Sequence, residues 1–169
     1  MPDAEAVADM HPRSEEFSGR AADEYDFDVE VYEFPQGTKT AADAADAIGC
    51  DVAQIASSIA FDADGELVVV VTSGANRVSE EKLAGLVGAD ASDVSMADAD
   101  DIKATLGWSI GGVPPFCHDS DVAVFMDETL TSFEEVWAAA GTPKAVFPID
   151  PETLEELSGA RVVDVAQSA

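Results

Sequence analysis

Two apolar runs separated by a short polar turn restrict the fold of this chain more than any other feature. Residues 55–61 and 67–72 are β-prone, and Asp62-Ala63-Asp64-Gly65 lies between them. Turn residues between two such runs predict an antiparallel hairpin. Because residues 67–71 are continuously aliphatic, the second strand is expected in the middle of a sheet, covered on both faces.

Strand and helix patterns alternate irregularly along the rest of the chain. Residues 28–34 alternate strictly between polar and apolar, which predicts a half-buried strand. Further strands are expected at 94–96, 122–126, 145–148 and 161–165, whereas 133–139 fits a strand or a helical turn. This irregular order predicts a mixed α/β domain rather than a doubly wound sheet.

Capping residues mark the expected helix ends. The helices are predicted at 15–22 after Ser14, at 41–48 after Thr40, from Ser79 to Gly88, from Asp98 or Asp100 to Leu106, and from Pro151 to about Leu157. We expect residues 1–10 to be a disordered tail and 11–169 to form one domain.

The charge of the chain is strongly unbalanced. Acidic residues outnumber basic ones by 35 to 8, which gives a net charge of −27, yet 47% of the residues are hydrophobic. That hydrophobic share argues against a disordered acidic tail. The composition is similar to that of halophilic proteins, whose charge repulsion molar salt screens, since the Debye length falls to about 3 Å. An acidic protein from an ordinary cell is the alternative.

Several classes of function are disfavoured by the composition. The eight cations are scattered, so binding to duplex DNA through its phosphates is not expected. The apolar runs are too short to cross a membrane, and two cysteines cannot build a disulfide framework. There is no zinc-ligand spacing and no phosphate-binding glycine fingerprint. We therefore expect a cytoplasmic protein without a metal or cofactor.

Residues 105–118 are the candidate working site. This stretch holds three glycines, Pro114-Pro115, Trp108, Cys117 and His118. Glycines permit positive φ and close approach to the backbone, so the amides of Gly111 and Gly112 could face a ligand. The alternative is a bulged turn between strands. A catalytic pair of Cys117 with His118 is disfavoured, because neighbouring side chains of an extended segment point to opposite faces.

Four segments resemble the YbaK/EbsC family of aminoacyl-tRNA deacylases, which are related to the editing domain of prolyl-tRNA synthetase. They are Thr40-Ala-Ala-Asp-Ala-Ala with Ile48-Gly49, residues 54–61, residues 73–78, and Gly107-Trp-Ser-Ile-Gly-Gly-Val-Pro-Pro. The resemblance implies a curved, mostly closed mixed sheet with flanking helices. It also implies hydrolysis of the ester of a small amino acid on tRNA for proline, with the acceptor end of the tRNA as partner.

The same resemblance assigns candidate site residues. Gly111 and Gly112 would hold the substrate carbonyl, and the terminal adenosine's own hydroxyl would help to activate water. The substrate-binding candidates are Tyr32, Lys39, Thr40, Ser58, Trp108, Pro114 and Asp127. The family carries a functional lysine at the position of Ser57, and a serine brings no charge. Lys39 is a candidate substitute, with an ordinary exposed lysine as the alternative.

Three functions are therefore compared. The first is a deacylase that the serine weakens. The second is a non-catalytic module that binds an aminoacyl-adenosine-like ligand or a protein partner. The third is a thiol-dependent hydrolase that uses Cys117. The sequence leaves the oligomeric state open.

Overall fold

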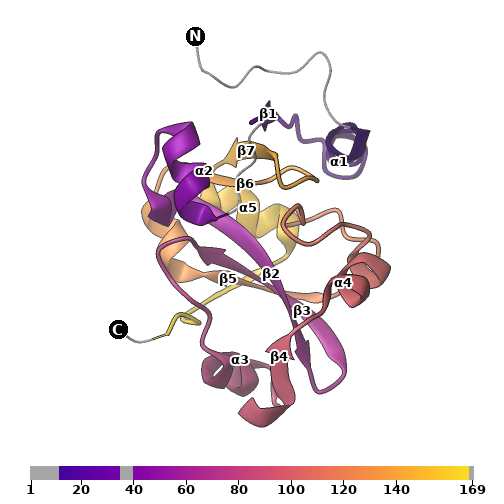
Figure 1. Cartoon of the computed structure of the whole chain (residues 1–169), viewed down its shortest axis with the longest axis vertical. Helices are drawn as coiled ribbons and strands as arrows, with labels where there is room; N and C mark the ends of the chain where they lie inside the picture. Colours follow the sequence, from indigo (N-terminus) through magenta and orange to yellow (C-terminus); the bar gives the residue numbers. More distant parts are fainter. Residues whose placement is uncertain (1–11, 35–39, 168–169) are drawn as a thin grey trace.

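The computed structural model describes residues 12–34 and 40–167. Figure 1 shows the long hairpin of β2 and β3 running through the molecule, with α2 near one end of it and α3 and β4 near the other. The helices are α1 (Pro12–Tyr25), α2 (Ala41–Ile48), α3 (Glu80–Val87), α4 (Ala99–Leu106) and α5 (Pro151–Ser158), with short 3-10 turns η1 (Val52–Gln54), η2 (Ala91–Asp93) and η3 (Glu128–Ser132).

Eight strands form one mixed sheet. They are β1 (Tyr32–Glu33), β2 (Ile55–Ala63), β3 (Glu66–Ser73), β4 (Val94–Met96), β5 (Ala123–Asp127), β6 (Val136–Ala139), β7 (Ala145–Ile149) and β8 (Arg161–Val163). The order is β1-β7-β6-β2-β3-β5-β8, and β4 pairs with β2. The mixed α/β class and the single domain are thus confirmed, but the sheet is not closed into a barrel, since no described pairing joins β1 to β8.

The predicted hairpin has the expected central position. Val69 and Val71 of β3 belong to one buried cluster, while Val68 and Val70 belong to another. Phe17 of α1 packs in the first cluster and Leu83 of α3 in the second. Because β3 is buried on both faces, its continuous apolar run is explained by the two cores that flank it.

The helix caps are largely as predicted. Thr40, Ser79, Asp98 and Asp150 each accept a hydrogen bond from the backbone N–H three residues later. Ser14 is an exception, because α1 already begins at Pro12 and Ser14 is buried inside it. A proline at the first helical position needs no N–H partner, which explains the earlier start.

The predicted strand at 28–34 is mostly wrong. Only Tyr32 and Glu33 pair, with Val146 and Ala145 of β7. Val31 and Phe34 are both buried, although alternation puts them on opposite faces, and a strand also needs a partner edge. At 133–139, the strand alternative holds for residues 136–139. No helix in the described part of the chain is long and apolar enough to span a membrane.

Candidate functional site

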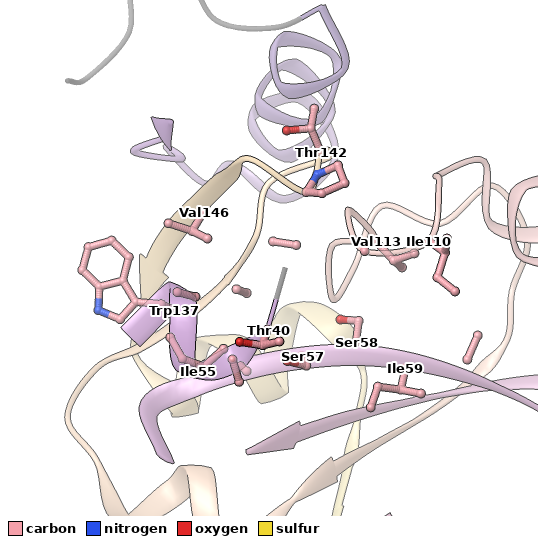
Figure 2. Close-up of a pocket in the computed structure, with 18 of the residues that line it drawn as sticks. Thr40, Ile55, Ser57, Ser58, Ile59, Ile110, Val113, Trp137, Thr142 and Val146 are labelled. Carbon is pink, nitrogen blue, oxygen red and sulfur yellow. The ribbon is translucent and has the colours of Figure 1, made fainter. Parts of the chain in front are cut away.

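A cavity of about 370 Å³ opens beside β2. Its walls come from the start of α2, from β2, from the end of β4, from the loop at 110–113 and from the β6–β7 turn (Figure 2). The cavity therefore collects segments that are far apart in the sequence.

The cavity lies at a gap in the sheet. On one edge of β2, Ile55 and Ala56 pair with β6, and residues 61–63 pair with β4. Between these two ladders, residues 57–59 have no backbone partner on that edge within the described chain. An open strand edge presents backbone donors and acceptors that a ligand can use.

The cavity wall is uncharged. None of the described lining residues is acidic or basic, and the polar side chains among them are the hydroxyls of Thr40, Ser57, Ser58 and Thr142. Small and aliphatic side chains make up most of the rest. A cavity of this kind favours a small, uncharged ligand group, because a buried charge without a counter-ion is costly.

The two adjacent glycines have different roles. Gly111 lines the cavity and has a φ of 86°. Gly112 instead donates its N–H to the Ser109 carbonyl at 3.0 Å, which closes a turn, so that amide is not offered to a ligand. A Cβ on Gly112 would lie 2.7 Å from the Thr142 Cα. Gly112 therefore lets the loop pack directly against the β6–β7 turn.

Three of the predicted side chains line the cavity with Gly111. They are Thr40, Ser57 and Ser58. The Thr40 hydroxyl also caps α2 by accepting from the Asp43 N–H at 3.1 Å. The Ser58 hydroxyl is buried and has no hydrogen-bond partner among the described residues.

Trp108 and Pro114 flank the loop at 110–113 and do not line the cavity. Trp108 is fully buried, and its Nε1–H donates to the Cys117 carbonyl at 2.9 Å. The Arg13 guanidinium lies 4.2 Å from the centre of its ring. The Pro114 carbonyl pairs with the Nε2 of His118 at 2.8 Å. These contacts fix the shape of the loop.

Cys117 does not have the environment of a nucleophile. Its side chain is buried and does not line the cavity. Burial raises the pKa of the Cys117 thiol to about 12, so the reactive thiolate is scarce at neutral pH. The geometry therefore gives no support to a thiol-dependent hydrolase.

Tyr32 and Asp127 lie away from the cavity wall. Tyr32 packs edge-on against Trp137, with ring centres 5.5 Å apart, and its hydroxyl donates to Glu30. Asp127 is fully buried and accepts hydrogen bonds from Asn76 and from the backbone of Ser73. Burial opposes ionisation of Asp127, but these hydrogen bonds outweigh it and lower its pKa. The candidate Lys39 lies outside the described residues.

Sequence reasoning missed the walls that β4 and the β6–β7 turn supply. Met96, Thr142 and Pro143 line the cavity. Gly141-Thr142-Pro143 carried a turn signal in the sequence. That signal cannot show which other loop the turn will face.

Comparisons with known proteins agree with this fold. The family model for the aminoacyl-tRNA editing domain matches residues 35–157. The uncharacterised protein YwhH of Bacillus subtilis is 30% identical over 140 residues, which cover 82% of this chain and 87% of that protein. A proline–tRNA ligase of Lysinibacillus sphaericus is 33% identical over 88 residues, 52% of this chain but only 15% of the ligase.

A solved structure gives the same result. It is described as a candidate trans-editing enzyme for prolyl-tRNA synthetase, is 34% identical, and covers 95% of this chain and 100% of its own, with a TM-score of 0.88. The residues that the family model matches include every residue that lines the cavity. The chain belongs to the aminoacyl-tRNA editing domain family.

Proposed function

We propose that this chain is a deacylase that hydrolyses the ester between a small, wrongly attached amino acid and tRNA. The observation that carries the proposal is the uncharged cavity at the gap in the sheet, with Gly111 in its wall. Similarity to proline–tRNA ligases and to the trans-editing structure supports tRNA for proline as the substrate.

Ester hydrolysis in such a site can proceed with backbone N–H donors and a positioned water, without a catalytic side chain. Water attacks the ester carbonyl, the carbon–oxygen bond to the ribose breaks, and a proton passes to the departing ribose oxygen. The charge that develops on the carbonyl oxygen needs N–H donors. No described residue accepts a hydrogen bond from the Gly111 N–H, so this amide is available as a donor. A neighbouring ribose hydroxyl is our candidate for holding the water.

The wall of the cavity also predicts which amino acids are removed. Ala56, Ala60, Ala138 and Ala145 line it, together with several aliphatic side chains. An alanyl group fits such a wall, whereas an aspartyl or arginyl group would lose its hydration without gaining a counter-ion. We therefore expect alanyl-tRNA to be cleaved faster than tRNA carrying a charged amino acid.

The rim of the cavity suits the terminal nucleoside. Met96 is 63% exposed and Ile110 is 53% exposed, and both line the cavity. Large apolar side chains that remain exposed often mark a binding surface. We place the base of the terminal nucleotide against these two side chains. Because the chain has a net charge of −27, it is poorly suited to bind tRNA through its phosphates. An apolar contact with the base does not require that phosphates be neutralised.

The test is hydrolysis of a panel of mischarged tRNAs by the purified protein in molar KCl. The expected result is release of alanine from tRNA for proline, and Gly111→Ala is expected to slow it. Gly85→Ala on α3 is the matched control, because its Cβ would meet no atom within 4 Å. If no mischarged tRNA is cleaved, even by a Ser57→Lys variant, the enzymatic proposal fails.

A second candidate is a non-catalytic binding module. It is favoured by Ser57, which lines the cavity at the position where the resembled family carries a lysine. This candidate predicts that an aminoacyl-adenosine analogue raises the melting temperature while the wild type and Ser57→Lys both release no amino acid.

A further inference from the structure

The backbone of Ser58 faces the open edge of β2. The Ile55 carbonyl accepts from Gly74 on the β3 side at 2.8 Å, whereas the Ala60 carbonyl accepts from Ala97 on the β4 side at 3.0 Å. Because carbonyls alternate in direction along a strand, those of residues 56, 58 and 60 point to the edge shared by β6 and β4. The N–H and C=O of Ser58 therefore point to that edge.

Neither neighbouring ladder reaches Ser58. The parallel ladder with β6 ends at Ala56, and the antiparallel ladder with β4 begins at Phe61. Ser58 thus lies between the two ladder ends, and the cavity occupies this gap. Its backbone donor and acceptor are the groups that a further strand would pair with.

The side chain of Ser58 adds a third polar group. Its hydroxyl is buried, and none of the described residues hydrogen-bonds it. Figure 2 shows this side chain directed away from β2 toward the loop that carries Ile110 and Val113. Buried hydroxyls nearly always have a partner, so an unpartnered one in a cavity wall indicates a place for a ligand's polar group.

We propose, on the basis of the deacylase function above, that the aminoacyl group pairs with Ser58 as a one-residue strand. Its neutral α-amino group donates to the Ser58 C=O and to the Ser58 hydroxyl oxygen, and its ester carbonyl accepts from the Ser58 N–H. An amino acid carries the same donor and acceptor as a strand residue, so it can fill the gap between β6 and β4. The Ser58 contacts then recognise the α-amino group, while the apolar wall of the cavity limits which side chain fits.

The test compares two non-hydrolysable probes by calorimetry with the full chain in 2 M KCl. One is 3′-alanylamino-3′-deoxyadenosine, and the other is its 3′-propionylamino counterpart, which lacks the α-amino group. For the wild type, the propionyl probe is expected to bind at least about tenfold more weakly, because it cannot donate to the Ser58 carbonyl.

Two variants test the contribution of the Ser58 hydroxyl to binding. Ser58→Ala is expected to weaken the alanyl probe several-fold and to leave the propionyl probe unchanged. Its melting temperature is expected to stay the same or rise, because an unpartnered buried hydroxyl is removed. Ser95→Ala on β4 is the matched control, since that side chain is exposed and does not line the cavity, and it should preserve the ratio between the two probes.

The outcomes distinguish this pairing from the proposed function. Equal binding of the two probes by the wild type would overturn the pairing, while release of alanine from mischarged tRNA would leave the deacylase standing. A Ser58→Ala variant that weakens both probes equally would also overturn it. Absence of alanine release from every tRNA, with no binding of the alanyl probe, would remove the proposed function and the pairing together.

Discussion

The substitution Gly112→Ala probes how the candidate site is built. A Cβ on Gly112 would lie 2.7, 2.8 and 2.9 Å from the Cα, C and N atoms of Thr142. Real side chains do not approach a backbone that closely, so the loop at 110–113 and the β6–β7 turn must move apart. Overpacking of this kind costs about 1–3 kcal/mol.

Two assays measure the expected loss of stability and of deacylation rate in Gly112→Ala. For a domain of this size, 1 kcal/mol lowers the melting temperature by about 2–4 °C, so we expect a fall of about 2–12 °C. The shift also moves Gly111, and a misplacement of about 1 Å can cost on the order of a hundredfold in rate. Scanning calorimetry and single-turnover deacylation in molar KCl measure the two effects.

Two other glycines serve as comparisons. Gly111→Ala would meet only Pro143, at 3.4 Å, so its cost is the positive φ of 86°, about 1–2 kcal/mol. Gly85→Ala meets nothing within 4 Å, and in a helix it should stabilise by up to about 1 kcal/mol. If Gly112→Ala keeps the melting temperature and rate of the wild type, the close packing of loop on turn is not what shapes the site.

Three further predictions test other parts of the account. Ser57→Lys should speed deacylation by roughly tenfold to a hundredfold, because a charge-assisted hydrogen bond contributes about 1.5–3 kcal/mol; an unchanged single-turnover rate would show that Ser57 does not occupy a site where a cation helps. Burial lowers the pKa of His118 below its ordinary 6.5, so the unfolded state takes up a proton first and stability should fall as the pH is lowered from about 7 to 5. His118→Gln should flatten that dependence in thermal melts, and an equally steep slope would contradict the assignment. With a net charge of −27, the melting temperature should rise between 0.1 and 2 M KCl as repulsion is screened; a salt-independent value would argue against a halophilic protein.

Local signals predicted the parts of the fold that local chemistry determines. The turn at 62–65, the cap at Thr40 and the stop at Gly49 all depend on residues within a few positions of one another. The prediction of a strand at 28–34 was mostly wrong because pairing depends on β7, more than a hundred residues later, whose ladder with this segment includes only Tyr32 and Glu33.

The candidate site divides in the same way. Thr40, Ser57, Ser58 and Gly111 could be named from the resemblance and do line the cavity. Gly112 and Trp108 belong to the same motif, but their contacts hold the loop in position instead of facing the cavity. The gap between β6 and β4 has no local signal, because it arises where two ladders end at different positions along β2.

The central claim is that ester hydrolysis takes place in the cavity at this gap, and filling the cavity tests it most directly. Ala139 lines the cavity, whereas Ala123 lines a separate acidic cleft. We propose to measure single-turnover alanine release from mischarged tRNA for proline in 2 M KCl, with melting temperatures as a check on folding. The account predicts that Ala139→Phe abolishes release and that Ala123→Phe leaves it unchanged. Wild-type release by a folded Ala139→Phe variant would contradict it.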